Sequence, residues 1–377
     1  MISSGLSARI SQSKILENLI VSSFVVFAIS SIGEINSDQG KKLLLDSIRA
    51  SLILSAIIYH AALRKVKIST LLISLAAVSW GGILGDYFII DAALGFLIST
   101  IISKEDQASI LNKSAWGVVI VTIITITLSK LGLIESKTFT NTLFNEVSLS
   151  TASKESFGFW HPNIASLFVV SCMICSFLTK NRALLFCSFA LYLLIILETI
   201  TRTYVPIVIG ILLFLLLTKI SSRSERLFRK LSIYSSLASL SIGLFMCSLG
   251  ALDEIISGSM LSTLDSLLSY RITIIQRELG SLSEIDAMTG LHYKKNQIDS
   301  LYANTIISIG IIGLLSWIVV ALIALKGLAE KQRTRELFVF SSFLLISNFE
   351  SPVSASSLLF AALIVSVNSA RYKQYKK

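Results

Sequence analysis

The sequence predicts an all-α integral membrane protein, a polytopic helical bundle in which residues 1–377 form a single transmembrane domain of about twelve helices. Composition is the first indication: 53% of the residues are hydrophobic and 15% are charged, whereas about 25% are charged in soluble domains. The second indication is the positive mean hydropathy of the chain, +0.76. The third indication is that apolar windows of roughly 16–22 residues, long enough to cross a bilayer as helices, recur along the chain.

Each expected helix is an apolar window between polar, charged or glycine-containing segments. The windows lie at residues 19–33, 43–61, 69–83, 86–102, 115–134, 162–179, 183–199, 203–218, 231–250, 302–325, 336–348 and 355–369. The third and fourth windows are separated by little more than three glycines and Asp86. Two connections are long, residues 135–161 and residues 251–301.

The Lys and Arg residues predict the orientation. If both termini are cytoplasmic, about 22 of the 33 basic residues lie on the cytoplasmic side, as the positive-inside rule requires. An even number of spans is consistent with this arrangement. The net charge of +10 is then explained by orientation rather than by a nucleic-acid partner. Both long connections, 135–161 and 251–301, become external loops.

The cytoplasmic connections are short and basic, which leaves no room for a nucleotide-binding domain. The sequence contains neither a Walker glycine–lysine loop nor an Asp-x-Asp pair of the kind that holds a metal–nucleotide complex. Cys172 and Cys175 form a CxxC pair inside an apolar run, where the spacing places two small hydrophobic side chains on one helix face. We therefore expect no metal and no cofactor, and any enzymatic activity is expected on the outer side.

Arg202 lies between two apolar runs in residues 193–217. An arginine in hydrocarbon costs from about 3 to more than 10 kcal/mol, so we expect two helices joined by a turn, with Arg202 at the outer surface. One interpretation is a structural ion pair with Glu198, four residues earlier. The other is a guanidinium that binds phosphate, flanked by the hydroxyls of Thr201 and Thr203.

A second polar group is the FGFWHPN motif, residues 157–163, at the outer end of the sixth window. Trp160 and Pro162 fit an interfacial aromatic belt and the first turn of a helix, which requires no chemistry. His161 and Asn163 are not explained by that interpretation, so both are candidate site residues.

A third group lies in the loop 251–301. Apolar positions recur every three or four residues between 264 and 282, which predicts an amphipathic helix on or in the membrane surface. Arg271 and Arg277 both lie on it, and His292 follows in the same loop. For Lys294 and Lys295 an ordinary solvated surface loop is the preferred explanation.

The loop returns to the membrane at Asp299-Ser300-Leu301-Tyr302, which leads into a helix whose Gly310 and Gly313 are expected to let helices approach closely. Together with the external HPN, the TRT arginine and an S-x-R element, this order of motifs resembles the Wzy-type O-antigen and capsule polymerases, which are related to the O-antigen ligases. The resemblance covers roughly residues 157–315, and elsewhere only hydropathy matches.

The resemblance implies a glycosyltransferase of the bacterial inner membrane. It would polymerise oligosaccharide repeat units carried on undecaprenyl diphosphate at the external face, in synthesis of O-antigen or capsular polysaccharide. The implied partners are that lipid-linked oligosaccharide, the lipid bilayer, and possible accessory proteins, namely a chain-length regulator and the repeat-unit flippase.

Arg202 and Arg271 match the two external arginines of the family, which are expected to hold the donor diphosphate. The acceptor hydroxyl needs a base, for which Asp299 is the first candidate and His161 the second; alternatively, Asp299 only positions the acceptor. Further residues expected to contact substrate are Arg277, Asn163, Thr201, Thr203, Tyr302 and His292.

Two other functions remain open at the level of sequence. The related ligases carry a His-Asn pair where this chain has Asp299 and Ser300, which counts against transfer of glycan to lipid A-core. A flippase for lipid-linked oligosaccharides would also have about twelve spans, but we find no internal repeat, and the polar groups cluster at the outer face rather than at the midplane.

Overall fold

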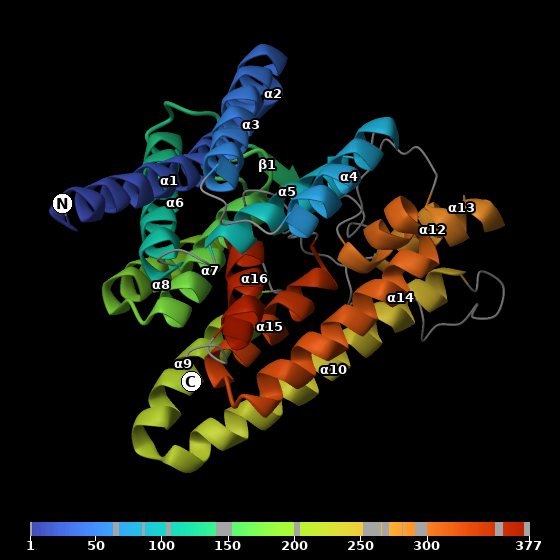
Figure 1. Ribbon diagram of the computed structural model, residues 1–377. Coiled ribbons are helices and arrows are strands. Elements are labelled where there is room, and N and C mark those ends of the chain that lie inside the picture. The colour runs from blue at the N-terminus through green and yellow to red at the C-terminus, as the bar shows by residue number, and fades with distance from the viewer. Residues whose placement is uncertain are drawn as a thin grey trace. The chain divides into compact units, whose positions relative to one another are not determined.

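The computed structural model describes residues 2–62, 68–84, 87–102, 107–140, 153–199, 204–251, 265, 271–280, 282–290, 300–350 and 357–372 (Figure 1). This part of the chain is almost entirely helical, as predicted. The helices are α1 (Ile2–Ser30), α2 (Gly33–Ser37), α3 (Gln39–Ala62), α4 (Ile68–Leu84), α5 (Tyr87–Ile102), α6 (Gln107–Lys130), α7 (Pro162–Thr179), α8 (Arg182–Thr199), α9 (Val205–Ile220), α10 (Ser222–Ala251), α12 (Arg271–Leu279), α13 (Glu284–Thr289), α14 (Leu301–Glu330), α15 (Thr334–Ser347) and α16 (Leu358–Tyr372).

Every apolar window predicted from the sequence contains a helix, and α7 has the predicted bounds. Among the described residues, four helices are long and apolar enough to cross a membrane: Gln39–Ala62, Gln107–Lys130, Arg223–Ser248 and Leu301–Glu330. The other apolar helices found there are shorter. Together these helices indicate a membrane protein.

Three helices, α1, α6 and α10, begin well before their apolar windows. α1 includes the polar N-terminal segment, and α10 begins at Ser222 although its window begins at 231. Hydropathy detects only the apolar part of a helix, whereas backbone hydrogen bonding continues through polar turns. The connection 135–161, expected to be external, also contains a structure that hydropathy did not predict. Strands β1 (Thr138–Thr140) and β2 (Ser153–Glu155) pair antiparallel there.

The chain divides into two compact units. The first unit comprises residues 1–70, 97–212 and 356–365, and the second comprises residues 71–96, 213–355 and 366–377. Each unit has its own helix packing, described separately below.

In the first unit α1 packs against α3 and α6, and α7 packs against α6 and α8. The buried apolar side chains of α1 recur every four residues, at Leu16, Ile20, Phe24 and Ala28, and so form one stripe along the helix. Because Gly117 of α6 has no side chain, α6 approaches α1 closely: a Cβ there would lie 2.5 Å from Val25 Cγ2.

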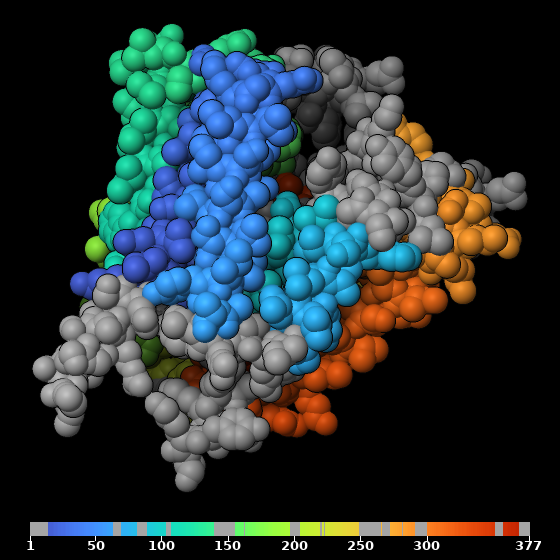
Figure 2. Space-filling view, turned by 45° about the horizontal axis from the view of Figure 1, so that its top comes forward, coloured from blue at the N-terminus to red at the C-terminus, as the bar shows by residue number. Residues whose placement is uncertain are grey.

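The outer side of α3 is apolar and exposed. Leu43, Leu44, Leu54 and Ile58 are between 56% and 70% exposed, and Figure 2 shows α3 lying along this face of the first unit beside α6. An exposed stripe of large apolar side chains on a helix of this length is typical of contact with lipid.

The CxxC pair lies on α7, which is buried over most of its length. The Cys172 thiol donates to the carbonyl oxygen of Ala115 at 3.4 Å, and the Cys175 thiol contacts the carbonyl oxygen of Leu358 at 3.8 Å. Both thiols are fully buried and unoxidised. They pack as small side chains between α7 and its neighbours, as the sequence suggested.

In the second unit α10 packs against α15, α14 and α12, and α13 packs on α14. The Asn348 side-chain amide donates to the carbonyl oxygen of Ser239 on α10 at 3.2 Å and so joins the end of α15 to α10. The Tyr302 ring of α14 lies over Gly243 of α10, where a Cβ would come within 2.6 Å of the ring. These contacts join α14 and α15 to α10.

Candidate active site

The FGFWHPN motif forms a turn with an uncommon backbone conformation. We define the HPN turn as residues Ser156–Asn163. Phe157 has a φ of 52° and Gly158 a φ of 81°. A positive φ is easy for glycine but strained for a bulky residue such as Phe157. Strain of this kind persists only where the surroundings enforce it, and it concentrates at functional sites.

The backbone of the HPN turn is hydrogen-bonded to the junction between α1 and α2. Gly33 N donates to Gly158 O at 2.7 Å, and Trp160 N donates to Ser31 O at 3.2 Å. A Cβ on Gly33 would lie 3.2 Å from Phe159 O, so the two backbones are in direct contact. The turn is therefore fixed to a segment more than a hundred residues away in sequence.

Aromatic packing and one cation fix the turn from its other sides. Phe159 is fully buried, and its ring meets Phe168 of α7 edge to face at 5.8 Å between centroids. Lys130 Nζ lies 5.0 Å above the Phe157 ring and 2.9 Å from the Glu155 carboxylate. The buried rings explain how Phe157 keeps its strained conformation.

His161 is the N-cap residue of α7, with Pro162 in the first turn. Its Nδ1 accepts a hydrogen bond from the backbone N–H of Asn163 at 3.2 Å. An imidazole that accepts at Nδ1 and is neutral carries its proton on Nε2. In this arrangement Nε2 is a hydrogen-bond donor. To act as a base through Nε2, His161 would first have to give up the cap, so the geometry favours a donor role.

Trp160 extends the exposed part of the turn. Its side chain is 44% exposed, and its ring centroid lies 5.6 Å from that of His161. An aromatic ring beside a hydrogen-bond donor is a common way to hold a sugar. The same position also suits an interfacial aromatic belt, as expected from the sequence.

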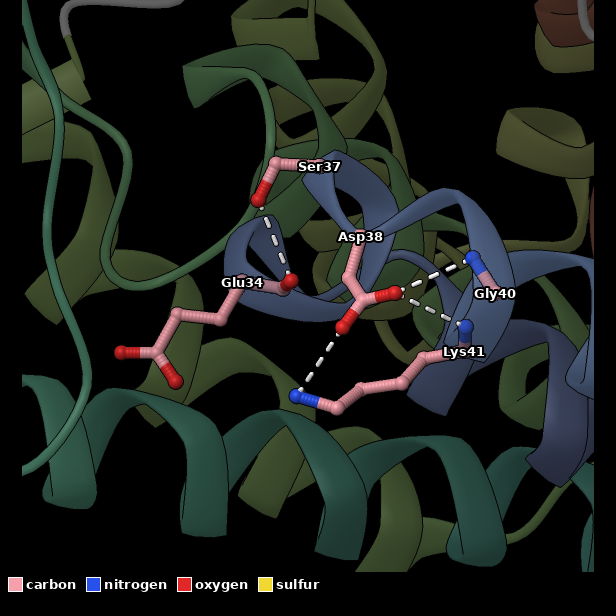
Figure 3. A network of polar contacts seen from close by, with 5 residues as sticks. All are labelled: Glu34, Ser37, Asp38, Gly40 and Lys41. Carbon is pink, nitrogen blue, oxygen red and sulfur yellow. Dashed lines mark hydrogen bonds and ion pairs between the residues drawn. The ribbon is translucent and has the colours of Figure 1, made fainter.

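A cluster of polar contacts around Asp38 lies at the α1–α2–α3 junction that holds the turn (Figure 3). Asp38 accepts hydrogen bonds from the backbone N–H groups of Gly40 and Lys41 at 3.0 and 3.1 Å, and it pairs with the Lys41 ammonium at 3.2 Å. These interactions, led by the backbone hydrogen bond from Lys41, lower the pKa of the Asp38 carboxyl. The Glu34 carboxylate points away from this cluster and accepts from the N–H of Glu135 at 3.0 Å.

The helical hairpin α7–α8 relates the HPN turn to the segment that contains Arg202. α7 ends at Thr179 and α8 begins at Arg182, with Lys180 between them in the left-handed conformation. Because the two packed helices are joined by so short a turn, they run antiparallel, and the start of α7 and the end of α8 lie at the same end. α8 ends at Thr199 and also contacts β2. The chain thus enters residues 200–203 from the end of the hairpin that carries His161.

α8 is described as far as Thr199 and α9 begins at Val205, so the break predicted near Arg202 falls on residues that the structure does not describe. Several predicted site residues lie outside the described part of the chain: Thr201, Arg202, Thr203, His292 and Asp299. The ion pair suggested between Glu198 and Arg202 is likewise not described.

The predicted amphipathic helix is present in the second unit as α12, which carries both Arg271 and Arg277 and ends at Leu279, three residues earlier than expected. Arg271 is its first residue. The Arg277 side chain is 73% exposed and lies 3.3 Å from the Glu278 carboxylate. A carboxylate this close competes with an anionic ligand for the Arg277 guanidinium.

Sequence reasoning did not identify Asp265. Its buried carboxylate accepts from the backbone N–H of Ile272 at 2.8 Å and from that of Thr273 at 3.3 Å, and it also accepts from the Thr273 hydroxyl. It therefore caps the N-terminus of α12 beside Arg271 and stabilises the helix dipole. The only sequence signal is an acidic residue shortly before an amphipathic run, which occurs too often to be diagnostic.

Tyr302, expected to contact substrate, is fully buried against Gly243. Its hydroxyl has no hydrogen-bond partner among the described residues. Its neighbour Asn304 is also buried on α14. Tyr302 therefore packs between α14 and α10, whereas its contact with substrate stays a prediction.

The structure thus brings His161 and Asn163 together in the first unit. In the second unit it places Arg271 and Arg277 on α12 and Tyr302 on α14. Within the described ranges no group of three or more His, Cys, Asp and Glu side chains is arranged to hold a metal. No protein-family model, no curated protein and no solved structure matches the chain.

Proposed function

We propose that the chain is a glycosyltransferase that polymerises undecaprenyl-diphosphate-linked oligosaccharide repeat units into O-antigen or capsular polysaccharide. The observation that supports this most is the HPN turn. It is a strained turn, held by three other segments, that carries His161 at the same end of the α7–α8 hairpin from which the Arg202 segment leaves. Fixed geometry of this kind is what a site needs to orient two large substrates.

The proposal includes a topology of about twelve spans with both termini in the cytoplasm of a bacterial cell and the HPN turn outside the inner membrane. In the first unit, helix ends that this topology puts on the same side of the membrane contact one another. The end of α1 contacts the HPN turn at the start of α7, whereas Thr179 at the end of α7 bonds Asn112 near the start of α6 at 2.6 Å.

Cysteine labelling tests this topology in a background with all four native cysteines replaced by alanine. A membrane-impermeant maleimide added to spheroplasts should label Trp160→Cys directly, and Lys180→Cys only after the membrane is permeabilised. Both positions are exposed. Labelling of Lys180→Cys in sealed spheroplasts would contradict the orientation.

In the proposed reaction a hydroxyl of the acceptor repeat unit attacks the anomeric carbon of the donor glycan. A new glycosidic C–O bond forms, and the C–O bond to the diphosphate breaks. Undecaprenyl diphosphate leaves with the electron pair, and the hydroxyl proton passes to a base, for which Asp299 is the first candidate. Arg202 and Arg271 would neutralise the charge that develops on the diphosphate, which requires no metal or other cofactor.

His161 then acts through its Nε2–H as a donor to a sugar or phosphate oxygen, rather than as the base. Other contacts to substrate are proposed for Asn163, Arg277, Thr201, Thr203, His292 and Tyr302. The bilayer positions the lipid-linked substrates, and a chain-length regulator and the repeat-unit flippase are the proposed protein partners.

The test is the pattern of surface glycan from cells that lack the gene and carry wild type or Arg202→Ala in its place. The proposal predicts a single repeat unit on gels from the deletion strain and from Arg202→Ala, and a ladder only with wild type. Arg202→Lys should also fail to restore the ladder, because a lysine lacks the planar fork that binds phosphate in two places. A ladder that persists in the deletion strain would exclude polymerisation, and loss of all attached glycan would indicate a ligase or flippase instead.

A further inference from the structure

Burial along α14 changes abruptly at Gly310. Each residue from Leu301 to Ser308 is buried, although this segment follows a long external loop. From Ile309 onward large apolar side chains are exposed on one side, and Ile309, Ile312 and Leu315 are 43%, 60% and 56% exposed. The first two turns of α14 are therefore enclosed by protein, and the remainder presents an apolar outer face.

The backbone breaks at the same residue. Gly310 has φ 77° and ψ 179°, so α14 consists of two helical pieces. The second piece, Ile311–Glu330, is roughly 30 Å long at about 1.5 Å per residue, which matches the hydrocarbon thickness of a bilayer. Lys326, near its far end, has a stem long enough to reach the membrane surface. The length and the exposure both place the outer edge of the hydrocarbon near Gly310.

The short helix α13 contacts this break directly. A Cβ on Gly310 would lie 2.2 Å from Met288 O, and a Cβ on Gly290 would lie 2.4 Å from Gly310 N. The two backbones are thus in contact, and only glycine fits on either side. α13 is capped at both ends, by the Ser283 hydroxyl, which accepts from Asp286 N, and by Gly290 in the left-handed conformation.

One side of α13 is apolar and uncovered. Ile285 is 71% exposed and Met288 is 51% exposed, and their spacing of three residues puts them on the same face. Since the Met288 backbone touches Gly310, this face continues into the exposed stripe of α14 that begins at Ile309. Large apolar side chains that continue a lipid-facing stripe have lipid as their natural neighbour.

We propose that α13 rests on the outer edge of the bilayer, with Ile285 and Met288 inserted among the lipids. This contact would hold Leu301–Ser308 just above the hydrocarbon. It would hold α12 in the same layer, because α12 packs on α14 and α10. Headgroup phosphates lie at that depth, so the contact fixes the height of Arg271 relative to the membrane.

The proposal is tested by depth measurements on the full-length protein in nanodiscs, again with the four native cysteines replaced by alanine. Spin labels are attached at Ile285→Cys and Met288→Cys, with Ile312→Cys as the lipid-facing reference and Glu284→Cys as the polar control on the same helix. Power saturation then compares collisions with oxygen, which enriches in lipid, and with a nickel chelate, which stays in water.

Labels at positions 285 and 288 should collide with oxygen about as often as at 312 and be at least several-fold less accessible to nickel than at 284. Nickel accessibility equal to that at 284 would overturn the proposal, because the face would then be in water. Protection from both reagents would also overturn it, because protein would then cover the face. A second readout avoids spin labels: in a variant whose four native tryptophans are replaced by phenylalanine, brominated lipid should quench the fluorescence of Ile285→Trp, and absence of quenching would contradict insertion.

Discussion

At the scale of the residue, Phe157 shows how the site is built. Its left-handed conformation costs on the order of 1–3 kcal/mol for a residue with a bulky side chain. The contacts that offset this cost come from other segments, namely the ammonium of Lys130 over its ring and the backbone of Gly33 against the next residue. The backbone conformation of the FGFWHPN motif thus depends on residues outside the motif, and no local sequence pattern connects them with it.

Gly158→Ala should destabilise the protein by roughly 2–4 kcal/mol, through its positive φ and through crowding. A Cβ at this position would lie 3.2 Å from Ser129 Cβ and 3.2 Å from Thr125 Cγ2. Gly132→Ala is the matched control, because Gly132 has a φ of 71° but nothing within 4 Å of an added Cβ. The measurement is thermal unfolding in detergent. Equal losses in the two variants would show that the turn is not tightly held against α6.

His161→Asn separates the structural role of the residue from its chemical role. Asparagine caps helices as well as any residue, so the unfolding temperature should stay near that of wild type, whereas His161→Ala should lose about 1 kcal/mol. Polymer formation should fall at least tenfold in both variants, because neither keeps the imidazole Nε2–H. A normal glycan ladder from His161→Asn would show that His161 acts only as the N-cap of α7.

At the scale of the element, the second unit depends on close contacts between α10 and α14. Tyr302 lies over Gly243, and α13 meets α14 at Gly310. The sequence predicted close approach at Gly310 and Gly313. This is confirmed at Gly310. At Gly313 an added Cβ would meet the side chain of Ile309 on the same helix, so Gly313 does not mediate contact between helices.

Gly243→Ala should destabilise the protein by about 1–3 kcal/mol, since its methyl group would overlap the Tyr302 ring. Gly327→Ala on α14 is the control, because an added Cβ there meets nothing within 4 Å. That substitution should stabilise the helix by up to about 1 kcal/mol through helix propensity alone. Opposite shifts in unfolding temperature are therefore expected, and a stabilised Gly243→Ala variant would contradict the packing of Tyr302.

Glu17 connects α1 to α6 through Lys113 at 2.8 Å and through the Ser109 hydroxyl at 2.6 Å. Burial alone would raise the pKa of the Glu17 carboxyl, but these hydrogen bonds together outweigh it and lower the pKa below its ordinary 4.5. A lowered pKa means that the stabilisation is complete above pH 4.5 and is lost as the pH falls through the folded-state value.

Glu17→Gln should therefore cost about 1 kcal/mol at pH 7 and progressively less below pH 4. The measurement is the difference in unfolding temperature between the variant and wild type across this range. Glu330→Gln serves as the control, because Glu330 is 65% exposed and lies 4.0 Å from Lys326. A difference that does not depend on pH would show that the carboxylate charge at Glu17 contributes nothing.

At the scale of the whole molecule, hydropathy predicted where helices lie, because burial in lipid requires long apolar runs with satisfied backbones. It did not predict the β1–β2 pair, the capping of α12 by Asp265 or the contact between the HPN turn and Gly33. The contact with Gly33 joins segments more than a hundred residues apart, and strands of three residues are too short to show a period. An acidic residue shortly before an amphipathic run is too common a pattern to predict the cap. For the candidate site, the sequence identified His161 as a histidine at the membrane interface and a helix start, but not the cap that determines which of its nitrogens carries a proton.

The central claim is that the chain itself forms the glycosidic bond, with Arg202 and the HPN turn at one outer site. The most direct test is polymerisation by the purified protein in liposomes supplied only with undecaprenyl-diphosphate-linked repeat units. We predict a ladder of products, one undecaprenyl diphosphate released for each bond formed, and loss of both with Arg202→Ala in a protein that unfolds at the wild-type temperature. Folded wild-type protein that binds the substrate but leaves it as single repeat units would contradict the account.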